Sequence, residues 1–130
     1  MVEYRCDHVH LKANNIEETV RWYCDVVGGK ITFEGQFKGS KVYYVNVSGT
    51  DFIIYGKLED EEALPSSIKP RFGVDHFGFA VDDLDAALAD LRAKNVTILE
   101  GPLQPRPNQR IAYIEAPDQV RIELTERKKN

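Results

Sequence analysis

An aspartate–histidine pair occurs twice in this chain, each time at the start of a short apolar run. Asp7 and His8 open the first run, and Asp75 and His76 open the second. The chain has only three histidines, so two of them occupy the same place in two repeats. Imidazole is the commonest protein ligand for metals and also titrates near neutral pH. The repeated pairs therefore indicate metal binding or proton transfer.

The alternation of side chains along a strand predicts where these histidines point. The apolar neighbours of His8 and His76 must face the helices, which sends both imidazoles to the opposite face. The same alternation sends Glu123, near the C-terminus, to that face. Two histidines and a glutamate from separate strands match the facial triad that binds Fe, Mn or a similar divalent metal. Alternatively, the histidines only cap strands and Glu123 is a solvated carboxylate, as isolated His and Glu residues usually are.

His10 is the one histidine without a counterpart in the repeat, because Gly78 stands at the equivalent position. It lies two residues from His8, so we expect it on the same face of the strand. A neutral imidazole there can act as a general acid or base. In the alternative interpretation, His10 only supports the ligands or lines the wall of the site.

Each Asp–His pair begins the same predicted order of elements, namely a strand, a helix and three more strands. The first helix is expected after Asn15, a typical N-cap residue, and is expected to end at the glycines 28–29. The first half has predicted strands at residues 4–13, 30–33, 41–47 and 51–55. The second half has predicted strands at 74–81, 96–99, 110–115 and 120–125, a helix at 83–93, and a proline-bearing loop at 101–109.

This pattern predicts an α+β fold of two tandem βαβββ modules. They cover about residues 4–57 and 73–126, and a polar linker joins them at about 58–72. One module alone cannot cover both faces of its sheet, so the two sheets are expected to pair and enclose a concave metal-binding cavity. The 130 residues fit a single domain of this kind. Sheets that curl only part-way leave edges that a second copy can close, which favours a homodimer.

Composition excludes several kinds of partner. The formal net charge of −4 argues against nucleic acid or an anionic membrane. No apolar run is long enough to span a bilayer, and the first residues lack the apolar core of a signal peptide. The two cysteines, Cys6 and Cys24, form no disulfide framework, so we expect a reducing cytoplasm.

The chain resembles the vicinal oxygen chelate superfamily. This superfamily includes glyoxalase I, methylmalonyl-CoA epimerase, extradiol ring-cleaving dioxygenases, fosfomycin-resistance enzymes and bleomycin-binding proteins. The resemblance extends over about residues 4–126, and the segments that carry it are 7–11, 20–23, 75–81 and 113–123. These segments together are specific for the superfamily, and much less specific for any one of its activities.

The resemblance implies His8, His76 and Glu123 as the ligands of a divalent metal ion, with Fe or Mn favoured and Ni, Zn or Co possible. Glyoxalases and epimerases have a fourth ligand, usually Glu or Gln, where this chain has Ile53, which cannot coordinate a metal. Tyr113 stands ten residues before Glu123, as a tyrosine does in the dioxygenases and in the fosfomycin enzymes. Such a tyrosine can hydrogen-bond an oxygen atom at the metal; the alternative is an aromatic side chain that packs at the sheet rim.

By this resemblance the protein is a metalloenzyme that binds a small substrate through vicinal oxygen atoms. Three protein ligands suit a catechol and dioxygen, so an extradiol-dioxygenase-like activity is favoured. A lyase or isomerase like glyoxalase I or the epimerase is the alternative, although Ile53 departs from that pattern. A metal-free binding protein of the bleomycin-resistance type is a further alternative, against which the preserved His8, His76 and Glu123 speak.

Overall fold

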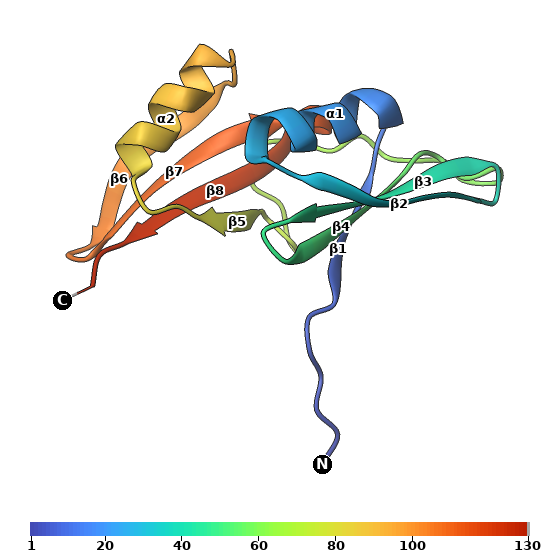
Figure 1. Ribbon diagram of the computed structural model, residues 1–130, viewed down its shortest axis with the longest axis horizontal. Coiled ribbons are helices and arrows are strands. Elements are labelled where there is room, and N and C mark those ends of the chain that lie inside the picture. Colours follow the sequence, from blue (N-terminus) through green and yellow to red (C-terminus); the bar gives the residue numbers. More distant parts are fainter. Residues whose placement is uncertain (130) are drawn as a thin grey trace. The chain divides into compact units, whose positions relative to one another are not determined.

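In the computed structural model, which describes residues 1–129, the chain divides into two compact units after Leu64. Each unit contains one α-helix and one four-stranded sheet (Figure 1). The elements follow the order βαβββ in both units, which confirms the predicted α+β fold. No helix within residues 1–129 is both long enough and apolar enough to cross a bilayer.

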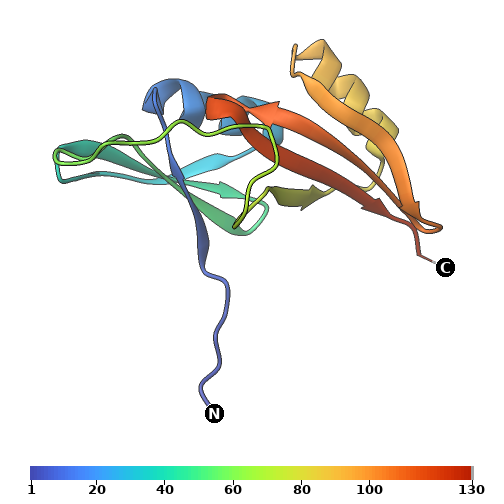
Figure 2. The same ribbon diagram turned by 180° about the vertical axis from the view of Figure 1, so that it is seen from behind.

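Unit 1 has the strand order β1-β4-β3-β2, in which β1 is parallel to β4 and the other neighbours are antiparallel. Residues 1–7 form an extended coil that leads into β1 (Figure 2). The strand predicted over residues 4–13 is therefore shorter than expected. The elements of unit 1 are β1 (His8–Lys12), α1 (Ile16–Val27), β2 (Lys30–Phe37), β3 (Ser40–Val47) and β4 (Thr50–Tyr55).

Helix α1 begins and ends at the residues that the sequence predicts. The side chain of Asn15 accepts a hydrogen bond from the Glu18 amide, and Gly28 adopts the left-handed conformation with φ of 77°. Glycine takes this conformation without a Cβ clash, which explains why the helix stops there. On the buried side of the helix, the ring of Tyr23 stacks on Phe52 of β4 with centroids 5.6 Å apart. This contact fixes the helix against one face of its sheet, so the predicted site residues of unit 1, His8 and His10, belong to the other face.

Unit 2 repeats this topology with the strand order β5-β8-β7-β6, and β5 is parallel to β8. Figure 1 shows α2 lying over one face of this sheet. The elements of unit 2 are β5 (Phe77–Ala80), α2 (Leu84–Ala93), β6 (Ile98–Arg106), β7 (Gln109–Ala116), the short 3₁₀-helix η1 (Pro117–Gln119) and β8 (Val120–Arg127).

Helix α2 is held at its N-terminus by two carboxylates. Asp83 accepts a hydrogen bond from the Ala86 amide, and the buried side chain of Glu126 accepts one from the Leu84 amide at 2.7 Å. Both amides belong to the first turn, which has no partners within the helix, and both carboxylates lie at the positive end of its dipole. Leu88 and Leu91 are buried on the sheet side. The helix therefore covers the sheet face opposite the one predicted for Glu123.

The loop predicted over residues 101–109 is wrong for most of its length. Strand β6 continues to Arg106 and pairs with β7, with Leu103 opposite Ile111. Prolines 102 and 105 lie within this strand. They are tolerated because β6 is an edge strand, whose outer amides need no partner in the sheet, and because its register shifts repeatedly. The proline-rich segment is thus part of the sheet.

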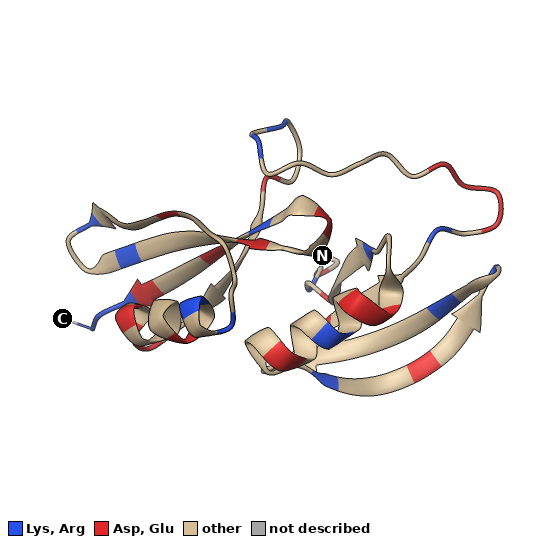
Figure 3. Ribbon diagram, turned by 90° about the horizontal axis from the view of Figure 1, so that it is seen from above, with Lys and Arg blue, Asp and Glu red and all other residues tan. Residues whose placement is uncertain are grey.

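The first part of the predicted linker is bound to unit 1. The Glu61 carboxylate pairs with Lys12 at the end of β1, with Nζ and Oε1 2.6 Å apart. The Glu59 amide donates to the carbonyl of Lys38, between β2 and β3. Figure 3 shows the acidic run at residues 59–62 in red. This run therefore holds the chain against the unit from which it emerges.

Candidate functional site

Four side chains of unit 2 are joined by two hydrogen bonds and one further polar contact, and are called here the His76 cluster: Asp75, His76, Tyr113 and Glu123. His76 Nε2 lies 3.4 Å from Glu123 Oε1. On the other side of the ring, His76 Nδ1 lies 2.7 Å from Asp75 Oδ2. Tyr113 donates its hydroxyl hydrogen bond to Glu123 Oε1 at 3.0 Å. The structure thus brings together two of the three predicted metal ligands and the predicted catalytic tyrosine.

The strands of unit 2 position the His76 cluster through alternation and register. Glu123 lies in β8 between Ile122 and Leu124, which are buried against α2, so its carboxylate points to the opposite face. Tyr113 is directly opposite Glu123 in the antiparallel pair of β7 and β8. His76 immediately precedes β5, which lies on the other side of β8. The three side chains therefore come from three adjacent strands onto one sheet face.

The charges around the His76 cluster are paired. The guanidinium of Arg121 lies 2.9 Å from Glu100 and stacks over the Tyr113 ring, with Cζ 4.0 Å from its centroid. The hydrogen bond to His76 lowers the pKa of Asp75. Burial, followed by the hydrogen bond to Glu123, raises the pKa of Tyr113. At neutral pH, Asp75 is therefore an ionised acceptor and Tyr113 a protonated donor.

Unit 1 contains the first half of the same arrangement. His8 Nδ1 lies 2.8 Å from Asp7 Oδ2, as His76 does from Asp75. The register of β1 and β4 places His10 opposite Ile53. The register of β5 and β8 places Gly78 opposite Glu123. Ile53 is therefore the structural counterpart of Glu123, and unit 1 has a branched alkyl group where unit 2 has a carboxylate.

His10 shares a face of β1 with His8, because the two residues are separated by one position. Its ring packs against Tyr55 of β4, with centroids 4.4 Å apart. Burial lowers the pKa of His10, and the neighbouring Lys12 lowers it further. His10 is therefore a neutral imidazole at neutral pH, and it can accept a proton.

Within residues 1–129, no group of three or more His, Cys, Asp or Glu side chains is gathered closely enough to hold a metal ion. Unit 2 holds the pair of His76 and Glu123, and unit 1 holds His8. This donor set nevertheless fits a divalent metal, because imidazole nitrogen and carboxylate oxygen are ligands of Fe, Mn, Zn and Ni. Each of the two histidines also has a carboxylate on Nδ1, as metal-binding histidines usually have. That His8 joins the His76 cluster stays a prediction.

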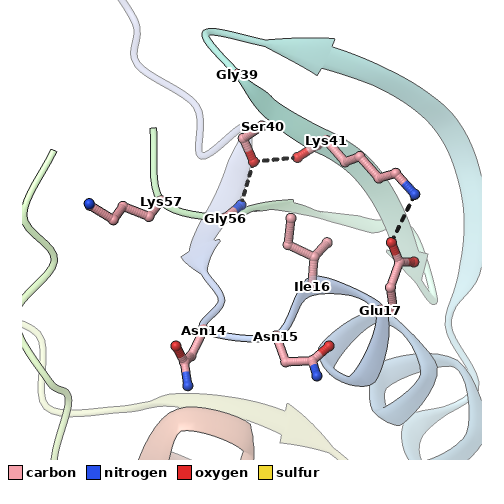
Figure 4. Close-up of a pocket in the computed structure, with 9 residues that line it drawn as sticks. All are labelled: Asn14, Asn15, Ile16, Glu17, Gly39, Ser40, Lys41, Gly56 and Lys57. Atoms are coloured by element: carbon pink, nitrogen blue, oxygen red, sulfur yellow. Dashed lines mark hydrogen bonds and ion pairs between the residues drawn. The ribbon is translucent and has the colours of Figure 1, made fainter. Parts of the chain in front are cut away.

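A pocket of about 460 Å³ lies elsewhere in unit 1, at the N-terminus of α1 (Figure 4). Inside it, Ser40 Oγ accepts a hydrogen bond from the Gly56 amide at 2.8 Å, and Lys41 pairs with Glu17 at 3.0 Å. None of the predicted site residues is among those that line it: Asn14, Asn15, Ile16, Glu17, Gly39, Ser40, Lys41, Gly56 and Lys57. Two pairs of its polar groups are thus engaged with each other, and the pocket contains none of the predicted metal ligands.

Sequence reasoning missed the structural partners of the predicted ligands. In the sequence, Asp7 and Asp75 were interpreted only as markers of the repeat. In the structure, each contacts the histidine that follows it. The signal was present, because an acidic residue next to a candidate ligand in both repeats is a candidate second partner. The pair of Arg121 and Glu100 had no such signal, because 20 residues separate the two in the chain and only the sheet brings them together.

Comparison with known proteins identifies the family. The Glyoxalase/Bleomycin resistance protein/Dioxygenase superfamily matches residues 5–124. A probable chloroplastic lactoylglutathione lyase of Arabidopsis thaliana is 27% identical in an alignment 130 positions long that covers 92% of this chain. The chain spans only 35% of the length of that relative. The metallothiol transferase FosB of Staphylococcus epidermidis is 26% identical over 120 residues, which cover 91% of this chain and 80% of the relative.

The fold has close counterparts among solved structures. One is the fosfomycin resistance protein FosX of Listeria monocytogenes, solved in complex with Mn(II) and sulfate. It superposes with a TM-score of 0.73 at 15% identity, over 95% of its own chain and 98% of this one. At this identity the likeness shows the fold alone. The family match, in contrast, extends over nearly the whole chain and both βαβββ modules. The protein therefore belongs to the Glyoxalase/Bleomycin resistance protein/Dioxygenase superfamily, the vicinal oxygen chelate proteins.

Proposed function

We propose that the protein is a divalent-metal-dependent enzyme that binds a small substrate through two vicinal oxygen atoms. His8, His76 and Glu123 are the proposed metal ligands, and the pairing of the two sheets around a cavity is part of the proposal. The observation that carries it is the His76 cluster, in which His76 Nε2 and Glu123 Oε1 are 3.4 Å apart on one sheet face. Each of these two groups also has a hydrogen-bonding partner of its own.

The donor set supports Fe or Mn as the metal. Two imidazoles and one carboxylate form the facial triad of such sites, which leaves positions open for substrate. Ni, Zn and Co accept the same donors and are the alternatives. When bound, the metal would act as a Lewis acid that polarises two substrate oxygen atoms.

Two further side chains are proposed to act on the substrate. His10, neutral and on the same face as His8, would accept the proton that a substrate hydroxyl loses on binding. On substrate binding, Tyr113 would turn its hydroxyl hydrogen bond from Glu123 Oε1 to a substrate oxygen, because a phenol has a single donor. The raised pKa of Tyr113 supports this role, because the phenol keeps its proton at working pH.

Ile53 favours dioxygenase-like chemistry within the superfamily. Because it provides no donor, three protein ligands remain, which suits a catechol and dioxygen. His10 favours a second candidate, a lyase or isomerase. It lies opposite Ile53, where it can transfer a proton in place of the absent carboxylate. A metal-free small-molecule binding protein is the outcome if no metal binds.

The proposed assembly is a homodimer. Strand β2 is an edge of the unit 1 sheet, and it exposes Ile31, Phe33 and Phe37 by 50%, 51% and 45%. An apolar edge strand is a surface that proteins usually cover. The cytoplasm is the proposed compartment, supported by the free thiols of Cys6 and Cys24.

The reaction class can be tested by anaerobic loading with Fe(II), followed by oxygen uptake on a panel of catechols. Oxygen consumption with ring-cleaved products supports the dioxygenase. Turnover of a hemithioacetal or an epimerisable acyl thioester with Ni, Zn or Co, without oxygen consumption, supports the lyase or isomerase instead. The variant Arg92→Gln, on the exposed side of α2, lies outside the proposed site and is a control for the effect of a surface substitution.

A further inference from the structure

We propose that Asp7 and Asp75 are positioning residues that select the ligating tautomer of His8 and His76. Each aspartate holds the proton of its histidine on Nδ1, so that Nε2 keeps its lone pair for the metal. This inference rests on the proposed function, because the choice of tautomer serves metal binding. The position of the proton can nevertheless be measured in the metal-free protein.

The geometry in unit 2 defines both sides of the imidazole. Nδ1 of His76 is 2.7 Å from Asp75 Oδ2, and Nε2 is 3.4 Å from Glu123 Oε1. An ionised carboxylate only accepts hydrogen bonds. In a neutral His76, the shorter contact therefore requires the proton on Nδ1. The lone pair then lies on Nε2, the nitrogen that faces the other proposed ligand.

Unit 1 provides an independent instance of the same contact. His8 Nδ1 lies 2.8 Å from Asp7 Oδ2. The residue opposite His8, on the parallel strand β4, is Asp51. Two units with different side chains on their functional faces thus keep the same adjacent pair. His10 is preceded by Val9 and has no adjacent carboxylate on its N-terminal side. The two Asp–His pairs therefore occur at the two proposed ligands and not at the third histidine.

The chemical consequence concerns the free energy of metal binding. A histidine with its proton on Nε2 must move that proton before it can coordinate through that nitrogen. A partner on Nδ1 removes this cost and also fixes the ring orientation. Outer-shell partners of metal-binding histidines typically contribute about 10- to 100-fold in metal affinity.

The first experiment locates the imidazole protons in the metal-free protein. Two-bond ¹H–¹⁵N correlation spectra, at a pH where the imidazoles are neutral, distinguish the two tautomers of each histidine. We expect the Nδ1–H form for His8 and His76 in the wild-type protein. In Asp75→Asn, the amide can donate to Nδ1, so the His76 signal should shift toward the Nε2–H form while that of His8 stays unchanged. Asp7→Asn should produce the reciprocal result.

The second experiment measures the affinity for Mn(II), by calorimetry or by competition with a chelator. Asp7→Asn and Asp75→Asn should each weaken binding about 10- to 100-fold. Asp25→Asn, on the exposed side of α1, should have no effect. Asp75→Glu keeps a carboxylate and should recover part of the affinity, which a loss of folding would not allow.

The outcomes separate this inference from the proposed function. The Nε2–H form at His8 or His76 in the metal-free wild type overturns the inference, and so does an unchanged Mn(II) affinity in both asparagine variants. If the wild-type protein binds no divalent metal while His8→Ala behaves identically, the proposed function fails. The spectra of the metal-free protein then still decide whether the aspartates select the tautomer.

Discussion

The sheet faces opposite the two helices have the same framework but different chemistry. In unit 2, four residues on this face are charged or hydrogen-bonded: Glu100, Tyr113, Arg121 and Glu123. The strand registers place these unit 1 residues at the equivalent positions: Phe33, Tyr44, Asp51 and Ile53. The tyrosine is kept, and isoleucine stands where unit 2 has Glu123, a proposed ligand. The two units thus share their strand pairing, while this face has three charged residues in unit 2 and one, Asp51, at the equivalent positions of unit 1.

This difference indicates that the two units contribute unequally to the proposed metal site. The polar face of unit 2 carries two of the proposed metal ligands, and the face of unit 1 carries one ligand beside aromatic side chains. Phe33 packs on Tyr44 at 5.0 Å between centroids, and Phe37 packs on Tyr55 at 5.7 Å. Strand pairing depends on the backbone and on the buried helix-facing residues, so the other face is free to diverge. We expect metal binding to depend mainly on the proposed ligands of unit 2.

Removal of a proposed ligand should have the largest effect. His76→Ala or Glu123→Ala should reduce metal affinity by more than the roughly 100-fold that outer-shell changes reach, and His8→Ala should do the same. The side chains lie on the face away from the helices, so the circular dichroism spectrum should not change. Calorimetric titration with Mn(II) measures the affinity. Ala variants that bind metal as the wild type does would remove these residues from the site.

Tyr113→Phe should slow turnover about 10- to 100-fold without loss of metal. The change deletes the hydroxyl that donates to Glu123 Oε1 but keeps the ring under Arg121. Steady-state kinetics with measured metal content separate the two effects. The matched change Tyr44→Phe, at the equivalent position of unit 1, should have a smaller effect. A metal-free Tyr113→Phe protein would mean that this tyrosine holds the ligand rather than the substrate.

Glu126→Ala should lower the free energy of unfolding by about 2 kcal/mol, because it leaves the Leu84 amide at the start of α2 without its charged acceptor. The counterpart of Glu126 in unit 1 is Gly56, whose amide donates to Ser40 Oγ. Ser40→Ala should cost less, about 1 kcal/mol, since this hydrogen bond is between neutral groups. Urea unfolding measures both. A larger loss for Ser40→Ala than for Glu126→Ala would contradict this ranking.

Ile53→Glu should make unit 1 resemble unit 2. A carboxylate at this position adds a possible fourth donor, and we expect metal affinity to rise about tenfold, or about 1.4 kcal/mol. Ile53→Met is the control, because it keeps an apolar side chain of similar size. Lower Mn(II) affinity in Ile53→Glu than in Ile53→Met would show that Ile53 is not equivalent to a ligand position.

The pH dependence linked to His10 should be the smallest effect. Its pKa is lowered in the folded protein, so below the ordinary value of 6.5 the unfolded chain binds more protons than the folded one. Stability should therefore fall as the pH drops through that value, and the loss should end once the folded imidazole is also protonated. His10→Gln should show a weaker decline in urea unfolding midpoints over this range. An identical decline in the variant would assign the pH dependence to other groups.

Most of the fold follows from local signals. Asn15 and Gly28 mark the ends of α1 because capping is decided by adjacent residues. Alternation around Glu123 identifies its face, because Ile122 and Leu124 must be buried. The extent of β6 could not be predicted, because Pro102 interrupts the local strand pattern and only the pairing with β7 compensates for it.

The candidate site, like the fold, was predictable only where local sequence signals decide it. The repeat and the alternation identify His76 and Glu123 as side chains on one face, and the structure places them 3.4 Å apart. The hydrogen bond from Tyr113 to Glu123 depends on the register of β7 and β8, which the chain specifies only once it is folded. Sequence reasoning thus identified the residue types of the site, while their hydrogen-bonding partners came from tertiary structure.

The most direct test of the proposed metal site is elemental analysis of the protein purified without chelators or a histidine tag. We predict about one Fe or Mn ion per chain in the wild type, and almost none in the triple variant with His8, His76 and Glu123 replaced by alanine. Folding of the variant is checked by circular dichroism. Equal metal content in the two proteins, or no metal in the wild type after anaerobic loading with Fe(II), would contradict the proposal.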